Sequence, residues 1–232
     1  MGQKQKTKQV IMTEGVIWKQ LLAFSMPLLV GNLFQQLYNT VDSIGSEALA
    51  AVGSSNSLIN LIIGMFMGIA TGAGVIISQY YGAKDDQKLH WAVHTCMALS
   101  LIGGTLLIVL GVLLSPLILK WMGTPEEVMP NSVAYLRIFF CGSLFNLVYN
   151  MGAGVLRAVG DSRRPLYYLC VSSVVNIILD MVFVVVFHMG TAGVGYATVI
   201  AQAVSSVLTV RTLMKTEDSY RLVPTQIRID RR

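Results

Sequence analysis

The chain has 232 residues, of which 54% are hydrophobic and only 12% are charged, and its formal net charge is +5. Soluble domains carry about 25% charged residues, so this composition excludes an ordinary soluble domain and requires a surface that meets lipid. The positive charge does not indicate nucleic-acid binding, because the basic residues fall at the ends of apolar segments and not on an aromatic-bearing polar domain.

Apolar runs long enough to cross a bilayer, which takes about 20 residues, recur along the whole chain. They predict an all-α polytopic membrane protein with six transmembrane helices, joined by short loops that contain Gly or Pro. The polar stretch 216–232 follows the last span, and we expect it to be a cytoplasmic linker or tail. The predicted spans are 18–44, 54–81, 91–117, 131–156, 165–188 and 192–214.

The positions of Lys and Arg predict the orientation in the plasma (inner) membrane. If the N-terminus is cytoplasmic, 15 of the 17 basic residues lie on the cytoplasmic side, and only Lys120 and Arg137 lie toward the other side. Loops rich in Lys and Arg stay in the cytoplasm. We therefore expect both termini there and an even number of spans. The basic N-terminal stretch lacks a short apolar region with a cleavage site, so no removable signal peptide is expected.

Residues suited to metal or covalent chemistry are scarce. The cysteines fall inside predicted spans without the spacing of metal ligands, and the histidines fall near span ends. No nucleophile, base and orienting group converge, and no cofactor motif appears. We therefore expect neither an enzyme nor a cofactor. The residues concerned are Cys96, Cys141, Cys170, His90, His94 and His188.

Two aspartates, Asp42 and Asp180, lie inside predicted spans. A carboxylate among lipid-length apolar helices costs at least a few kcal/mol, so it persists mainly where it faces a bundle interior or a water-filled cavity. Each has polar neighbours at helical spacing on the same helix face. Oxygen ligands of this kind replace the hydration shell of a hard cation or hold a proton, so they predict ion or proton transport. The neighbours are Asn32, Gln35 and Asn39 for Asp42, and Ser173 and Asn176 for Asp180.

Purely structural roles stay open for part of this pattern. Amide and hydroxyl side chains in membrane helices often join neighbouring helices by hydrogen bonds. Gly64, Gly68 and Gly72 form two consecutive small-xxx-small repeats, which predict close helix packing in the second span. Pro27 predicts a kink in the first span that serves either packing or bending.

Several longer stretches are together more specific than any single motif: WKQLLAFSMPLLVGNLFQQLYNTVDS, GSEALAAVGSS, GMFMGIATGAGVIISQYYGAKD, YNMGAGVLRAVGDSRRPLYY and NIILDMVFVVVFHMGTAGVGYATVIAQ. With them, the chain from Thr13 to Lys215 resembles the N-terminal half of a multidrug and toxic compound extrusion (MATE) transporter of the bacterial DNA-damage-inducible subgroup.

This resemblance implies one lobe of a twelve-helix antiporter whose two six-helix lobes surround a central cavity. Such proteins export cationic, often aromatic drugs in exchange for sodium or protons, so Na⁺ or H⁺ is the coupling ion. The resemblance also implies that Pro27 is linked to bending of the first helix. It places the cation-coupling site on Asp42, Asn176, Asp180 and Thr198, and the substrate cavity on Gln35, Tyr38, Tyr135 and Asn150.

The sequence departs from the family pattern in two ways. Ile44 is followed directly by Gly45, where the family has about six more residues, so roughly 9 Å is missing from the outer end of the first span. We therefore expect Asp42 close to the outer surface and Asp180 deeper. The second lobe has no counterpart, so the chain is expected to be incomplete alone and to pair with a copy of itself or with a separate C-terminal lobe.

Two other functions stay open. One is an inactive truncated lobe or a non-transporting membrane module. The other is a flippase for lipid-linked sugars, which needs cationic residues facing the cavity because its substrates carry phosphates. Away from the span ends, the predicted spans offer only Arg137 for that role.

Overall fold

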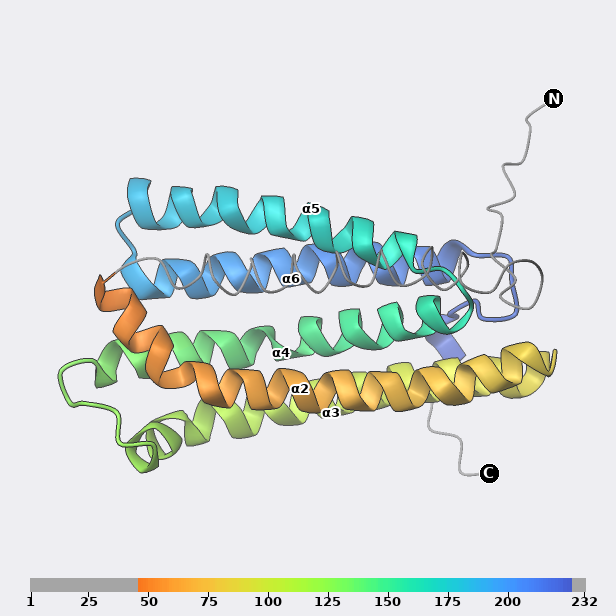
Figure 1. Ribbon diagram of the computed structural model, residues 1–232, viewed down its shortest axis with the longest axis horizontal. Helices are drawn as coiled ribbons and strands as arrows, with labels where there is room; N and C mark the ends of the chain where they lie inside the picture. Colours follow the sequence, from red (N-terminus) through yellow and green to blue (C-terminus); the bar gives the residue numbers. More distant parts are fainter. Residues whose placement is uncertain (1–45, 227–232) are drawn as a thin grey trace, which may run out of the picture.

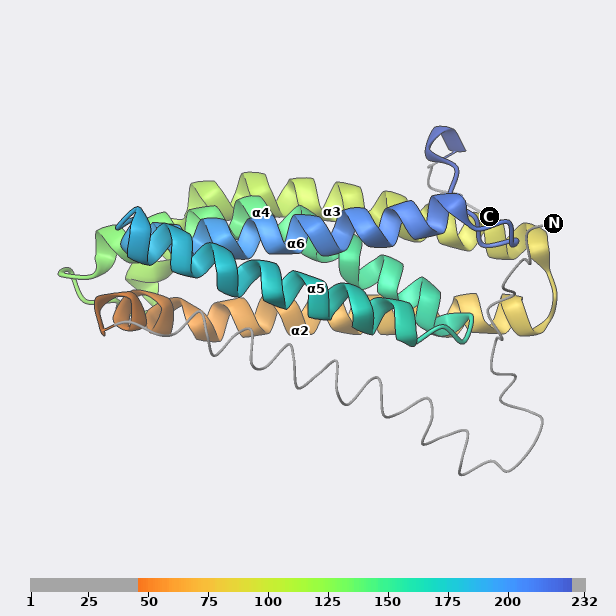
Figure 2. The same cartoon turned by 90° about the horizontal axis from the view of Figure 1, so that it is seen from above.

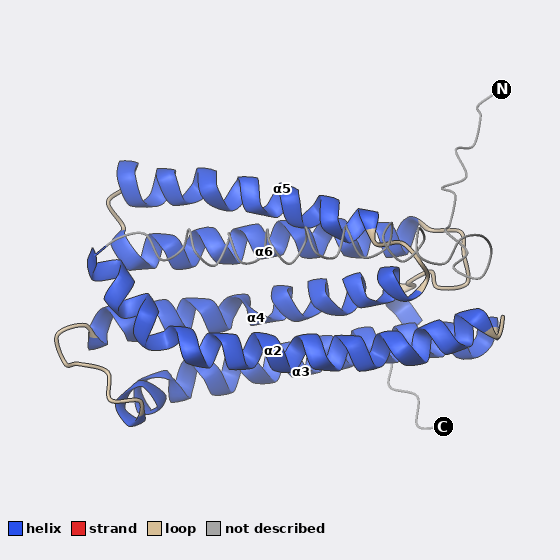
Figure 3. Ribbon diagram, viewed as in Figure 1, coloured by secondary structure: helices blue, strands red, loops and turns tan. Residues whose placement is uncertain are grey.

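The computed structural model describes residues 46–226, and their side chains from residue 59 onward. Within this part every regular element is helical (Figure 3). Five helices are long and apolar enough to cross a membrane, which confirms the predicted all-α polytopic class. The predicted first span, 18–44, and residues 227–232 of the predicted tail lie outside the described residues.

The long helices lie side by side as an elongated bundle (Figure 1). α2 begins at Ser46, before the predicted start at 54, and α3 extends beyond the predicted 91–117 at both ends. A short π-helix, η1, continues α5, and a short 3₁₀-helix, η2, closes the described chain. The elements are α2 (Ser46–Gly82), α3 (Asp86–Trp121), α4 (Met129–Ala158), α5 (Arg163–Asp180), η1 (Met181–Val186), α6 (Gly190–Lys215) and η2 (Pro224–Gln226).

Three consecutive helices, α2, α3 and α4, end with the same pair of backbone hydrogen bonds. At the end of α3, the N–H of Gly123 donates to Lys120 O and that of Thr124 to Leu119 O. This pattern requires a left-handed residue after the cap. Gly123 (φ 73°) and Gly160 (φ 89°) supply it after α3 and α4, whereas Lys84 (φ 54°) does so after α2. The chain can therefore reverse within a few residues between antiparallel helices.

α4 lies at the centre of the described bundle and packs against α2, α3 and α6 (Figures 1 and 2). In the most apolar stretch of α4, 72% of the residues are buried inside the bundle. The corresponding share for the span Arg163–Val186, which contains α5, is 17%. Two apolar clusters lie along α4, one at each end of the bundle. α5 packs chiefly against α6, so it lies at the margin of the described part.

Glycines on α3 and α4 allow these helices to approach closely. A Cβ built on Gly111 of α3 would lie 2.1 Å from the Phe140 ring of α4, and one on Gly154 of α4 would lie 3.0 Å from Ala70 O of α2. By contrast, a Cβ on any of the predicted packing glycines of α2 meets nothing within 4 Å among the described residues. These close approaches are therefore made by glycines of α3 and α4 and not by the predicted glycines of α2. The three open positions are Gly64, Gly68 and Gly72.

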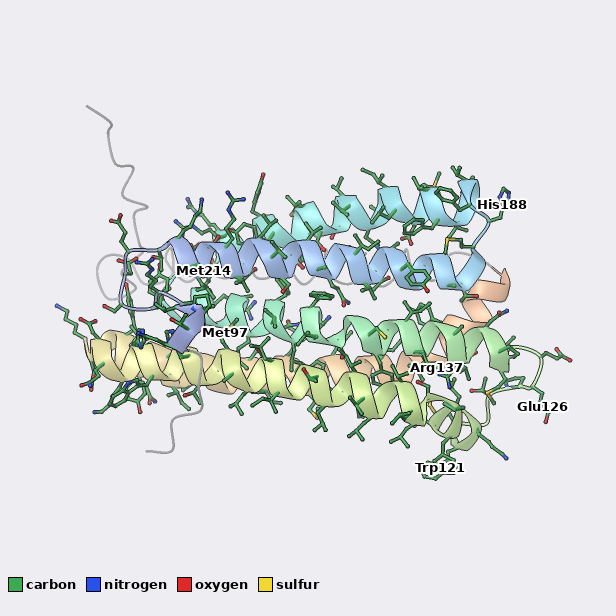
Figure 4. All side chains as sticks on the ribbon, turned by 180° about the vertical axis from the view of Figure 1, so that it is seen from behind. Met97, Trp121, Glu126, Arg137, His188 and Met214 are labelled. Atoms are coloured by element: carbon green, nitrogen blue, oxygen red, sulfur yellow. The ribbon has the colours of Figure 1, made fainter. Side chains whose placement is uncertain are left out.

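Arg137 has a structural role that the sequence did not reveal. Pro116 lies inside α3 and has no N–H, so the carbonyl of Val112, one turn earlier, loses its helical partner. The Nε of Arg137 on α4 donates to this carbonyl at 3.3 Å. Figure 4 shows Arg137 at the contact between α4 and α3. Arg137 thus replaces the hydrogen bond that Pro116 removes.

Candidate functional site

Asn176 and Asp180 form the clearest unsatisfied polar group of the described chain. They lie one turn apart on the same face of α5, and Asn176 is fully buried. The amide nitrogen and oxygen of Asn176 and both carboxylate oxygens of Asp180 are buried without a hydrogen-bond partner among the described residues. Buried polar groups are nearly always paired, so this Asn176–Asp180 pair is suited to a ligand or to a further part of the chain.

The helix changes its winding directly after Asp180. Residues Met181–Val186 form the π-helix η1, and Asp180 is the last residue of α5. π-Helical turns are rare and frequently occur at functional sites. η1 packs on α6 at Gly193, where an added Cβ would lie 3.0 Å from Phe183 Cβ. Asp180 therefore lies directly before a local irregularity that hydropathy does not predict.

Thr198 lies on α6 at about the same level as Asp180. Asp180 stands seven residues before the loop that begins at Phe187, and Thr198 stands eight residues after Gly190, at the start of the antiparallel α6. Thr198 is buried, and its hydroxyl donates to Val194 O at 2.9 Å.

The predicted cavity residues of α4, Tyr135 and Asn150, are both buried but lie apart. Fifteen residues of helix separate them, which is about 22 Å along the axis. Tyr135 packs against α6 at Gly195, where an added Cβ would lie 3.5 Å from Tyr135 Cδ2. The amide nitrogen of Asn150 donates to Asn146 O at 2.9 Å and to Asn146 Oδ1 at 2.7 Å. The structure does not bring these two residues to one point.

The predicted site residues of the first span lie outside the described residues. The structure therefore describes the α5 and α6 part of the predicted cation site and the α4 part of the predicted cavity. Among the described residues no group of three or more His, Cys, Asp and Glu side chains could hold a metal ion. The predicted residues not described are Pro27, Gln35, Tyr38 and Asp42.

Two hydrogen bonds between α5 and α6 were missed by sequence reasoning. Ser172 Oγ donates to Ala201 O at 2.6 Å, and Tyr168 Oη lies 2.5 Å from Thr212 Oγ. Both lie on the half of α5 that precedes Asn176. Ser172 and Tyr168 repeat at helical spacing with Asn176, which is the signal that points to this α6-facing stripe. These hydrogen bonds join α5 to α6 over the first half of α5, and the Asn176–Asp180 pair lies at the other end of the stripe.

A family model described as MatE matches residues 27–182. The match includes both residues of the Asn176–Asp180 pair. It covers more than half of the chain and agrees with the resemblance seen in the sequence motifs.

Two curated relatives come from Bacillus subtilis (strain 168). "Probable multidrug resistance protein YpnP" is 34% identical over 222 residues, which are 93% of this chain and 49% of the relative. "Probable multidrug resistance protein YoeA" is 36% identical over 195 residues, 80% of this chain and 42% of the relative. The chain thus spans about half the length of the curated relatives it matches.

Solved structures show the same fold. A crystal structure of MATE in the bent conformation superposes with a TM-score of 0.88 at 28% identity, covering 97% of this chain and 52% of that chain. An outward-facing multidrug resistance MATE family transporter of the MOP superfamily gives a TM-score of 0.87, also at 28% identity, over 97% of this chain and 51% of that one. This chain, a multi-pass membrane protein, therefore belongs to the MATE family of transporters.

Proposed function

We propose that this chain forms one six-helix lobe of a cation-coupled antiporter that exports organic cations, including drugs, across the plasma membrane. The observation that carries the proposal is the Asn176–Asp180 pair, whose four polar atoms are buried without a partner among the described residues. The relatives' names support the substrate class, because those proteins are described as multidrug resistance proteins.

Asp180 is the residue that couples transport to the ion. Its carboxylate is the only one among the described residues that lies more than one turn inside a membrane-spanning candidate. Carboxylate, amide and hydroxyl oxygens are ligands for hard cations, so Asn176 and Thr198 complete an oxygen site for Na⁺, or Asp180 alone takes a proton. Asp42 adds a second carboxylate from the first span.

The site exchanges one positive charge for another. A positively charged drug and the coupling ion both stabilise the same buried carboxylate, so binding of one lowers the affinity for the other. Pro27 allows the first helix to bend as the ion binds and leaves. The drug cavity is lined by Gln35, Tyr38, Tyr135 and Asn150.

Alternating access requires two bundles that move against each other around a fixed site. The described helices supply one bundle, and about half of each relative is not matched by this chain. We therefore propose that this lobe works with a second six-helix lobe, such as a second copy of the lobe or a C-terminal lobe. Both termini of the lobe face the cytoplasm, where most of its Lys and Arg residues lie.

A drug-accumulation assay in efflux-deficient bacteria tests the proposal. Cells expressing the wild-type chain should accumulate less of a fluorescent organic cation than empty-vector cells. Asp180→Asn should restore full accumulation while the protein remains in the membrane, because the amide can neither bind a proton nor balance the charge of a cation. Glu127→Gln, the same change in charge on the exposed α3–α4 loop, should behave as wild type.

Unchanged efflux in Asp180→Asn would overturn the assignment of the coupling residue. Absence of efflux by the wild type would favour a non-transporting module instead. A flippase for lipid-linked sugars receives less support. Such a substrate would need a cation deep in the bundle. Arg137, the basic residue farthest from a helix end in the described spans, already donates to Val112 O at 3.3 Å.

A further inference from the structure

The polar stretch that follows α6 folds back onto the bundle. We name Thr216–Gln226 the docked segment. The N–H of Leu222 donates to Leu213 O at 2.9 Å, and Arg221 Nε donates to Met214 O at 3.2 Å, so the segment turns back along the last turn of α6. Tyr220 and Leu222 are 3% and 2% exposed. In a free linker these two side chains would be exposed.

The docked segment enters the apolar cluster at the end of the bundle where α6 ends. Tyr220 and Leu222 join a cluster that includes Met97 of α3 and Leu213 of α6. Figure 4 shows Met97 and Met214 at this end, opposite to Glu126 and His188. The ring of Tyr220 meets that of Tyr81 of α2 edge to face, with centroids 6.5 Å apart. The segment therefore joins the ends of three helices, α2, α3 and α6.

One polar contact fixes the docked segment to α3. The backbone N–H of Val223 donates to Nε2 of His94 at 3.0 Å. The other ring nitrogen, Nδ1, lies 2.7 Å from His90 O, and since a carbonyl only accepts, Nδ1 carries the proton. His94 is 2% exposed, so water cannot replace either partner easily. The contact thus requires a neutral imidazole with a free lone pair on Nε2.

We propose that His94 is a pH-sensitive contact that holds the docked segment against α3 when neutral and releases it when protonated. Protonation places an N–H at Nε2, directly opposite the N–H of Val223. Two donors then face each other and the hydrogen bond is lost. Histidine is the side chain whose charge ordinarily changes near neutral pH.

The surroundings of His94 favour this response. His90 stacks on His94, with ring centroids 4.0 Å apart, and its backbone carbonyl lies 2.7 Å from Nδ1, so the orientation of the His94 ring is fixed. α2 contributes the Tyr81 ring. Burial raises the pKa of the Tyr220 phenol on the docked segment, so this phenol stays neutral near neutral pH.

Other charges nearby are exposed or already paired. Arg164 of α5 and Asp218 lie near Tyr220. Glu217, Asp218 and Arg221 of the docked segment are exposed, and Asp85 at the start of α3 pairs with Lys88 at 2.9 Å. The side chains that α4 contributes to the cluster are apolar, such as Met151 and Val155. No buried carboxylate of the described residues therefore compensates a charged His94.

Release of this contact changes the surface of the bundle at the end where α6 ends. With the docked segment in place, the end of α6 is tied to α3 through the contact of Val223 with His94. Without it, Tyr220 and Leu222 leave the apolar cluster and the end of α6 moves independently of α3. The inference is independent of the proposed cation site, because the two involve opposite ends of α6.

Hydrogen–deuterium exchange of the full chain in lipid nanodiscs tests this proposal. The amide protection of a peptide containing Val223 is compared at about pH 7.5 and about pH 5.5, after correction for the intrinsic pH dependence of exchange. In the wild type, protection should fall about tenfold at the lower pH, the effect of one lost buried hydrogen bond. Peptides from the middle of α4 serve as the internal reference.

Two variants distinguish the role of His94 from that of His90. His94→Gln removes the titrating ring but keeps a neutral side chain with an acceptor, so the ratio of protection at the two pH values should fall to about one. His90→Gln, one turn away on α3, should keep the wild-type ratio. A wild-type ratio near one, or a His94→Gln ratio equal to that of the wild type, would overturn the proposal.

Discussion

Two pairs of polar residues at the same helical spacing behave in opposite ways in this bundle. On α4, Asn150 donates its amide to Asn146, so the pair is satisfied within one helix. On α5, the Asn176–Asp180 pair has no partner for any of its four polar atoms among the described residues. Spacing alone therefore does not distinguish a structural pair from a binding pair.

The two helices differ in how they are surrounded. α4 is enclosed by α2, α3 and α6, and several of its contacts with them pass through glycines that allow close approach. α5 packs chiefly on α6 and leads directly into the π-helix η1. A satisfied pair in the packed helix stabilises the fold, whereas an unsatisfied pair in the marginal helix is available for function. Substitutions in each region test this contrast.

The largest effect on stability is expected at the contact of α3 and α4. Gly111→Ala places a Cβ 2.1 Å from the Phe140 ring, so the free energy of unfolding should fall by about 3 kcal/mol, the upper end for overpacked cores. Gly103→Ala, whose Cβ would lie 3.3 Å from a Leu147 methyl group, is the control for helix propensity. Reversible unfolding in mixed micelles measures both. Equal effects would show that α3 and α4 are not closely packed in the membrane.

The two Asn residues of the pairs should respond differently to the same change. Asn150→Ala leaves Asn146 Oδ1 buried without its donor and should lower the free energy of unfolding by about 1–3 kcal/mol. Asn176→Ala removes polar atoms that have no partner among the described residues, so stability should change little. Ion affinity should respond in the opposite way. Asn176→Ala should weaken ion binding more than Asn150→Ala does, because Asn176 is a proposed ligand. A destabilisation by Asn176→Ala as large as that by Asn150→Ala would remove the contrast.

A smaller effect is expected for Arg137, and it should depend on Pro116. Arg137→Met should cost about 1 kcal/mol in the wild type, since the carbonyl of Val112 loses its donor. In a Pro116→Ala background the helix supplies its own N–H to this carbonyl, so the same change should cost almost nothing. A double-mutant cycle measures this coupling. Equal costs in both backgrounds would show that Arg137 does not replace the missing bond.

Hydropathy and charge predicted the fold class because lipid-length apolar runs and polar turns are local properties. The Asn176–Asp180 pair was predictable for the same reason, since both residues lie on one helix. Other features depend on contacts between distant residues. Val223 bonds to His94 across 129 positions, and Arg137 reaches Val112 across 25. The π-helix after Asp180 follows no composition rule, because Met181–Val186 has the same apolar residues as an ordinary span.

Ion-dependent stability of the purified chain tests the central claim most directly. The Tm is measured against Na⁺ concentration at fixed pH, and against pH without Na⁺, for the wild type and Asp180→Asn. Binding to the folded state at 100 times Kd stabilises by about 2.7 kcal/mol, so the wild type should show an ion-dependent or proton-dependent shift of Tm. Asp180→Asn should abolish that shift. An equal shift in Asp180→Asn would contradict the assignment of Asp180 as the coupling residue.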